Sequence, residues 1–285
     1  MVIATRNRCG ELLRTLGKLA ALRQRPPVVV VDNGSTDQTV SAAHAAARTL
    51  GDIRLIRLRR NEGAVARNAG VAMAATPYVA FSDDDSWWAD GALPRAERVL
   101  DRHPRLGLLA ARTLVGPDEH VDPVSERMAA SPLGREPNLP GPSVLGFLAC
   151  SAVVRRQAFL EVGGFSRVLH FVGEETLLAY DLAAHGWHLC YVDSVVAHHH
   201  PSLIRANRLE RDVRELRNQA LVAWMRRPAP VAVGAGLGLL RRMPRYPPAG
   251  LAAAGALLRL PLALASRRRL PDEVERRIRV LDAAS

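Results

Sequence analysis

Hydrophobic and polar positions in the first 110 residues follow two periods in turn. Short apolar runs, such as the four valines at 28–31, alternate with stretches that carry leucine or alanine at helical spacing, such as 9–24. Strands that alternate with helices of this length indicate βαβ units and a parallel sheet. A run of valine is typical of a strand buried on both faces. We therefore expect an α/β fold with a Rossmann-like, mostly parallel sheet flanked by helices.

The pattern is less regular further along the chain. Residues 115–142 are rich in proline, glycine and charge, which is typical of a long active-site loop or an irregular crossing. Apolar strands and two helices follow, and residues 202–227 then carry alternating charges at helical spacing, whose simplest interpretation is a solvated helix face. We expect a domain over 1–202, with halves of about 1–112 and 113–202, and a helical extension, basic and apolar, over 203–285.

The positive charge is concentrated in this extension. Residues 1–200 hold 22 basic and 21 acidic side chains, whereas residues 201–285 hold 17 and 7, which together give the net charge of +11. A basic segment can bind nucleic acid or an anionic membrane, but few aromatics and no nucleic-acid module occur here, which argues against nucleic acid. The apolar runs 234–240 and 251–258 are shorter than the roughly 20 residues of a spanning helix. Peripheral membrane contact through 228–270 and packing on the core are the two alternatives.

Cysteine usage points to a reducing compartment. The three cysteines, Cys9, Cys150 and Cys190, form no C-x-x-C pair, and their odd number argues against a disulfide framework. The first residues become charged after five positions, unlike a signal peptide. We therefore expect a cytoplasmic protein, at the inner face of the cell membrane if the basic segment binds lipid.

Three adjacent carboxylates follow the apolar run 78–81. Asp83 and Asp85 are two positions apart, so on an extended chain they point the same way. Like charges this close repel unless a positive group lies between them. A divalent cation such as Mg²⁺ binds one or two carboxylates together with substrate phosphates. The pattern therefore favours a metal–diphosphate site over a solvated turn.

Three further stretches carry candidate chemistry. Asp32 ends the valine strand, where ligands of open α/β sheets bind, although it also suits a turn. Arg67 lies one helical turn beyond Gly63, so this stretch is either an anion-binding site at a helix start or an ordinary glycine-initiated helix with a surface arginine. Glu174 and Glu175 open a helix, where they suit a general base or surface acids favoured by the helix dipole. One of the histidines at 198–200 could complete a metal shell, but not all three, because neighbours on a strand face opposite ways.

Taken in order, these stretches resemble the family 2 glycosyltransferases of the GT-A fold. The resemblance covers residues 1–202 and rests on VIATRNRCGELLRTLGKL, VVVVDNGSTD, RNEGAVARNAG, FSDDDSWWADGAL, VVRRQAFLEVGGF, GEETLLAYDLAAHGW and VVAHH. Each stretch is a weak signal alone, but their shared order is specific for the family. It is not specific for a substrate.

The resemblance implies transfer of a sugar, usually with inversion, from a UDP-, dTDP- or GDP-sugar to an acceptor hydroxyl, with Mn²⁺ or Mg²⁺ as the cofactor. Residues 1–112 would bind the nucleotide and 113–202 the acceptor, a cell-envelope or lipid-linked glycan. The family usually has Glu-Asp where this chain has Glu174-Glu175, which leaves the base open between the two, with Glu175 at the usual position. The other roles carried over are the donor site for Thr5, Arg6, Asp32, Arg67, Asp83 and Asp84, and the metal for Asp85 and His198. One of Trp87 and Trp88, which follow the metal motif, could stack on a sugar or shape the acceptor cleft, while the other packs in the core.

Two alternatives compete with this interpretation. A nucleotidyltransferase would use a similar sheet and two acids, but it would have a glycine-rich loop after the first strand, and TRNRCGELL has one glycine. A non-catalytic relative that binds sugar nucleotides would have lost the metal-binding acids, and these are present.

Overall fold

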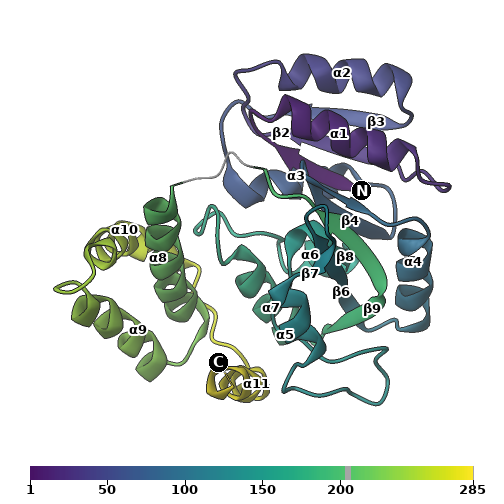
Figure 1. Ribbon diagram of the computed structural model, residues 1–285. Coiled ribbons are helices and arrows are strands. Elements are labelled where there is room, and N and C mark those ends of the chain that lie inside the picture. The colour runs from purple at the N-terminus through teal and green to yellow at the C-terminus, as the bar shows by residue number, and fades with distance from the viewer. Residues whose placement is uncertain (203–206, 285) are drawn as a thin grey trace.

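A computed structural model describes residues 1–202 and 207–284 (Figure 1). The first half is a parallel sheet in the order β3-β2-β1-β4. Its elements are β1 (Val2–Thr5), α1 (Cys9–Ala20), β2 (Val28–Asp32), α2 (Thr39–Thr49), β3 (Ile53–Arg57), the 3-10 helix η1 (Gly63–Val65), α3 (Ala66–Met73) and β4 (Tyr78–Asp83). The predicted βαβ units are therefore confirmed.

Beyond β4 the sheet becomes mixed. β4 and β6 each pair antiparallel with β8, β6 pairs parallel with β9, and β9 pairs antiparallel with β5. The elements of this part are β5 (Ser86–Trp88), α4 (Ala92–Arg102), β6 (Leu106–Val115), β7 (His120–Val121), α5 (Pro123–Ala129), the 3-10 helix η2 (Ala149–Ser151), β8 (Ala152–Arg155), α6 (Arg156–Glu161), α7 (Glu174–Ala184) and β9 (His188–His199). The α/β fold class is confirmed, with the parallel pairs concentrated in the first half.

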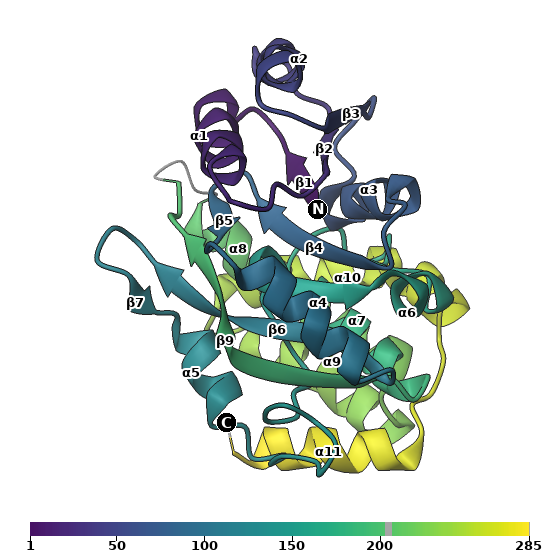
Figure 2. The same ribbon diagram turned by 90° about the vertical axis from the view of Figure 1, so that its right-hand side faces the viewer.

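The core lies on both faces of this sheet. In β2 the valines alternate, so that Val29 and Val31 join one apolar cluster while Val28 and Val30 join the other. Burial of every β2 side chain explains why that strand is a continuous apolar run. Helix α4 covers one face of β6 and β9, and α7 packs with the cluster on the other face (Figure 2).

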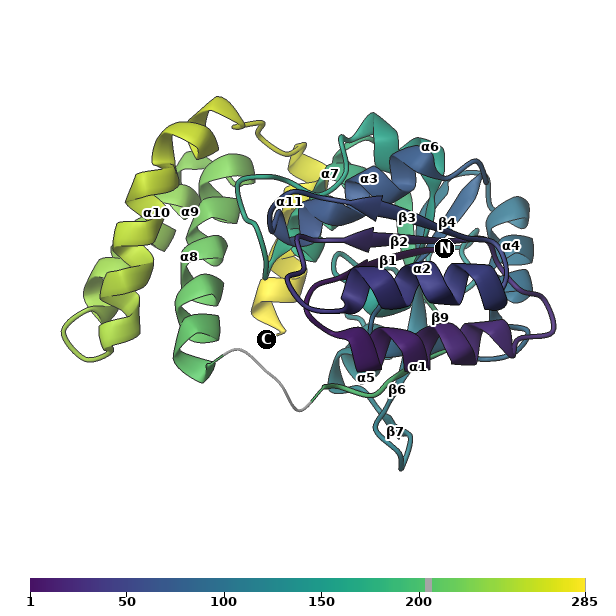
Figure 3. The same cartoon turned by 90° about the horizontal axis from the view of Figure 1, so that it is seen from above.

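The C-terminal part consists of four helices, α8 (Arg208–Arg226), α9 (Ala229–Arg242), α10 (Pro247–Ala265) and α11 (Asp272–Ala283). Helix α8 stands between α7 and the α9–α10 pair (Figure 1), and α8, α9 and α10 form one end of the molecule (Figure 3). Leu221, Met225 and Ile278 from α8 and α11 belong to the same apolar cluster as the sheet. The predicted boundary at 202/203 adjoins residues 203–206, which lie outside the described residues.

The structure corrects one prediction about the extension. Residues 251–258 are not an isolated short apolar run, because α10 continues through Arg259 and Pro261 over 19 residues. By length and composition it is the one helix within the described residues that could cross a membrane, although the same test admits core helices. Five of its seven alanines are buried against the protein, so length alone does not decide its role.

Candidate active site

The three aspartates at the end of β4 turn in different directions, and each meets a protein cation. Asp83 forms an ion pair with Arg67. Asp84 accepts a 2.8 Å hydrogen bond from the Thr5 hydroxyl and lies 3.2 Å from the guanidinium of Arg8. The same Arg8 nitrogen lies 3.2 Å from Asp85. The repulsion that the sequence predicts is thus relieved largely by two arginines.

Asp85 has the densest set of partners. Its carboxylate accepts a 3.0 Å hydrogen bond from the backbone N–H of Ser202 and lies 3.4 Å from Nε2 of His199. Burial alone raises the pKa of Asp85, but the contacts from His199, Ser202 and Arg8 outweigh it and hold the pKa below its usual value. Conversely, burial lowers the pKa of His199, and Asp85 more than offsets this, so that the pKa is raised.

Asp84 has a different environment from its two neighbours. Burial raises its pKa to about 7, although Arg8 and the hydrogen bond from Thr5 lower it. Its backbone carbonyl also accepts a 2.8 Å hydrogen bond from the hydroxyl of Thr15. Asp84 therefore ties β1 and α1 to the end of β4, while Asp83 and Asp85 lie to either side.

The histidine beside Asp85 is not the one that the sequence predicts as a metal ligand. His198 pairs with Glu119 at 2.9 Å and stacks on Trp87, whereas the next residue, His199, faces Asp85. Successive side chains of β9 point to opposite faces, so only one of the two can reach the aspartates. The candidate partner of Asp85 is therefore His199.

The two tryptophans predicted to lie near the acceptor are both buried. Trp88 is fully buried, and its indole N–H donates to the carbonyl of Phe81. Trp87 is 9% exposed and packs against Lys18 and His200, with its ring centroid 5.6 Å from the lysine nitrogen. Both residues therefore belong to the packing beneath the aspartates.

The predicted nucleotide residues gather at one edge of the sheet. Thr5 and Asp32 are paired in register on β1 and β2, and both side chains are buried, while Arg6 is exposed beside them. Asp32 accepts hydrogen bonds at 3.3 Å from the backbone N–H of Ser35, as its alternative role in a turn predicts. The carboxyl ends of β1, β2 and β4 meet here, as expected for parallel strands.

Glu174 and Glu175, at the start of α7, form a second acidic cluster. Glu174 is 2% exposed, and its Oε2 atom is buried without a hydrogen-bond partner among the described residues. Burial and the neighbouring Glu175 raise the pKa of Glu174 to about 8, and burial also raises the pKa of Glu175. The buried guanidinium of Arg67 acts on both glutamates and on Asp83, so it lies between the two clusters.

A residue that the sequence analysis missed holds the loop before this pair. The Asn218 amide of α8 donates to the carbonyls of Leu169, Phe171 and Val172 at 3.1, 2.8 and 2.6 Å. Within this loop His170 and Val172 have φ of 67° and 74°, which is rare and unfavourable for a β-branched residue. A C-terminal helix therefore stabilises the backbone that leads into the glutamates.

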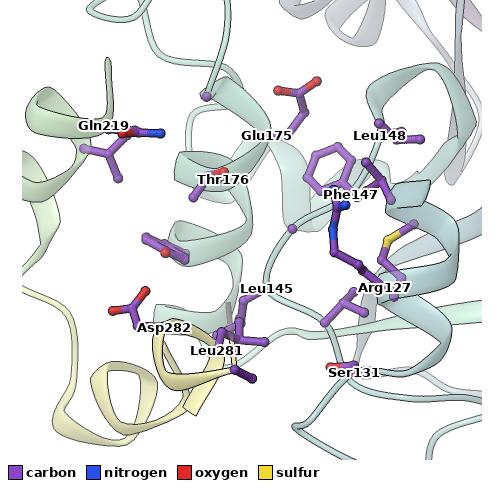
Figure 4. Close-up of a pocket in the computed structure, with 18 of the residues that line it drawn as sticks. Arg127, Ser131, Leu145, Phe147, Leu148, Glu175, Thr176, Gln219, Leu281 and Asp282 are labelled. Atoms are coloured by element: carbon purple, nitrogen blue, oxygen red, sulfur yellow. The ribbon is translucent and has the colours of Figure 1, made fainter. Parts of the chain in front are cut away.

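A pocket of about 900 Å³ opens beside Glu175 (Figure 4). Its lining is mainly apolar and comes from α5, residues 144–148, α7, α8 and α11, so the crossing at 115–142 and the extension both contribute. Around it Figure 4 labels Arg127, Ser131, Leu145, Phe147, Leu148, Glu175, Thr176, Gln219, Leu281 and Asp282. An active-site loop was one of the two interpretations of residues 115–142, and α5 from that segment lines the pocket, whereas no motif in the sequence marks α8 or α11 as part of it.

Known proteins share both this sequence and this fold. The sequence model of Glycosyl transferase family 2 matches residues 1–163. The Mycobacterium tuberculosis pre-mycofactocin glycosyltransferase is 33% identical over 214 residues, which are 72% of this chain and 43% of that protein. The N-acetylglucosaminyl-diphospho-decaprenol L-rhamnosyltransferase of the same organism is 29% identical over 67% of this chain and 72% of its own length. The chain thus spans less than half of the first relative.

Solved structures support the fold assignment. A mannosyltransferase from Pyrobaculum calidifontis, in complex with GDP-Man and Mn²⁺, superposes with a TM-score of 0.60 at 20% identity, over 100% of this chain and 74% of that one. S. aureus TarS in complex with UDP-GlcNAc superposes with a TM-score of 0.61 at 16% identity, over 96% of this chain and 81% of that one. The family match covers more than half of the chain and the aspartates at the end of β4, and the fold agrees. This protein therefore belongs to glycosyl transferase family 2.

Proposed function

We propose that this protein transfers a sugar from a nucleotide sugar to an acceptor hydroxyl, with inversion. The observation that carries the proposal is the position of Glu175. It lines a pocket large enough for an acceptor, and the buried Arg67 interacts both with its cluster and with Asp83 at the end of β4. A donor at the aspartates and an acceptor in the pocket would approach each other beside Glu175.

Glu175 is the proposed general base. It is partly exposed to the pocket, whereas Glu174 is buried. Its raised pKa makes it a better proton acceptor than an ordinary carboxylate. Glu175 would take the proton of the acceptor hydroxyl as the oxygen attacks the anomeric carbon, and the bond to the diphosphate would break on the opposite face.

Cationic side chains suit the departing diphosphate. Arg8, just before α1, and Arg67, in α3, pair with the aspartates that follow or end β4, where they would neutralise negative charge as it develops. Asp85 and His199 offer an oxygen and a nitrogen ligand for Mn²⁺ or Mg²⁺. No group of three His, Cys, Asp or Glu suited to a metal occurs among the described residues, so phosphates and water would complete the shell. A bound cation would supply further charge neutralisation.

The acceptor class rests on the relatives. Two of them are named for transfer to pre-mycofactocin and to a decaprenol-linked sugar. We infer a cell-envelope or lipid-linked glycan as the acceptor, and the inner face of the cell membrane as the place of action. The apolar lining of the pocket suits an acceptor with an apolar part.

The test is a thermal-shift screen of the full chain against UDP-, GDP- and dTDP-sugars, with and without Mn²⁺ or Mg²⁺. A ligand that binds the folded state raises the melting temperature by mass action. We expect one nucleotide class to raise it in a metal-dependent way, and that donor then enters acceptor trials. A folded sample that responds to no donor would contradict the proposal and favour a non-catalytic relative.

A further inference from the structure

Helix α10 exposes its large apolar side chains and buries its small ones. Leu251, Leu258 and Leu262 are 60%, 81% and 59% exposed. They are spaced by seven and four residues, which places them on one side of the helix. The opposite side packs on α8 through alanines that are at most 8% exposed, namely Ala249, Ala252, Ala253, Ala256 and Ala263. A surface helix of a globular protein normally has the reverse arrangement.

The neighbouring helix α9 repeats the pattern. Val233, Leu237 and Leu240 are 61%, 45% and 53% exposed, at spacings of four and three residues. Helices α9 and α10 pack on each other and form the outer layer of the molecule beyond α8 (Figures 1 and 3). We call the two rows together the leucine face: Val233, Leu237, Leu240, Leu251, Leu258 and Leu262. An apolar surface of this kind marks an interaction site.

The charge around the leucine face has one sign. Residues 216–271 contain ten arginines and neither aspartate nor glutamate. Arg241, Arg242 and Arg245 are exposed at the turn between α9 and α10, and Arg268 and Arg269 are exposed just after α10. Two copies of this surface would repel each other. Apolar side chains rimmed by exposed arginines match a bilayer with anionic headgroups.

We propose that the leucine face docks the protein peripherally on an anionic lipid surface. Helix α10 lies in the plane of the interface and does not span the bilayer, because its alanine side is held by α8 and Arg259 interrupts it. The other side of α8 lines the pocket through Gln219 and Val222. Docking would therefore hold the pocket one helix away from the lipid. It deepens the proposed function, but the test below needs neither donor nor acceptor.

The test is co-sedimentation of the full chain with vesicles of phosphatidylglycerol and phosphatidylcholine, against vesicles of phosphatidylcholine alone. The wild type should bind the anionic vesicles more tightly, and added salt should weaken binding. The triple variant Leu251→Ser, Leu258→Ser, Leu262→Ser should lose at least about tenfold in partitioning, because three leucines no longer enter the interface. Replacing Arg241, Arg242 and Arg245 by glutamine should lower binding to anionic vesicles only.

The matched control replaces two exposed leucines elsewhere, Leu13 and Leu160, by serine, and it should bind as the wild type does. Thermal melts of each variant establish that it is folded. Absence of binding by the folded wild type, or binding unchanged in the leucine variant, would overturn the proposal. A dimer that the leucine substitutions dissociate, without vesicle binding, would assign the face to a second copy instead.

Discussion

The two acidic clusters of the site are built in opposite ways. Asp83 and Asp85 each face a cation or a hydrogen-bond donor, and the pKa of Asp85 is lowered as a result. Glu174 has a buried oxygen without a partner among the described residues, and its pKa is raised to about 8. Environments that make the pKa values of two sets of carboxyl groups differ in this way commonly separate charge-binding roles from proton-transfer roles. The contrast supports the proposed roles, in which Asp83 and Asp85 serve the charged donor and the glutamates the acceptor proton.

The largest expected effect on activity comes from a substitution among the aspartates at the end of β4. Asp85→Ala removes the carboxylate beside Arg8 and His199, and transfer should fall by about 10³-fold or more. The measurement is turnover with the donor class found by thermal shift, together with the metal-dependent shift itself. The control Asp118→Ala, at an exposed position, should leave both unchanged. Normal turnover in the Asp85 variant would remove this residue from the donor site.

The second prediction tests the glutamate pair, Glu174 and Glu175. Glu175→Gln keeps the shape but cannot accept a proton, so kcat should fall by about 10²- to 10⁴-fold. Donor binding in the thermal shift should be unchanged. The matched variant Glu174→Gln should retain more activity, because Glu174 is buried away from the pocket. The reverse ranking would make Glu174 the base.

The two clusters also differ in how far the sequence predicts them. The sequence predicts Asp83 and Asp85 as site residues because parallel strands place their carboxyl ends at one edge and because three adjacent acids are unusual. It does not predict Arg8 as the partner of Asp84 and Asp85, since the distance along the chain hides the contact. The position of His199, instead of His198, depends on the register of β9 against β5, which local pattern does not specify.

The environment of the glutamates was harder to predict. Their spacing suggested a base, but their burial and the pocket depend on α8 and α11, which lie at least 30 residues further along the chain. Asn218 carries no local signal of its role, because three carbonyls of a distant loop become its partners only after folding. The strands and helices of the first half followed from periodicity, whereas contacts distant in sequence did not.

Asn218→Ala tests whether the C-terminal extension supports the loop that leads into Glu174 and Glu175. The carbonyls of Phe171 and Val172 lose the Asn218 donor and the loop with positive φ at Val172 loses support, so stability should fall by about 1–3 kcal/mol. If the loop aims Glu175, kcat should fall while the KM for the donor stays constant, and the pH profile should shift. The adjacent, exposed Gln219 provides the control, and Gln219→Ala should leave the melting temperature unchanged. Equal melting temperatures for both variants would contradict the role of Asn218.

The last prediction concerns how far the burial of Glu174 lowers the stability of the folded protein. The pKa of Glu174 rises from 4.5 to about 8 on folding. As the pH rises from 4.5 to 8, the carboxyl group loses its proton in the unfolded state but keeps it in the folded state, so the folded state becomes less stable. Glu174→Gln does not titrate, and its melting temperature should exceed that of the wild type by a growing margin over that window and by a constant one above it. At least several degrees are expected, since each pKa unit corresponds to about 1.4 kcal/mol and each kcal/mol to roughly 2–4 °C. Melts at about pH 5 and about pH 8.5 measure the margin, and Glu97→Gln, at an exposed site, should show none. A margin that is equal at both values would mean that Glu174 is ionised in the folded protein at low pH, and the contrast between the two acidic clusters would fail.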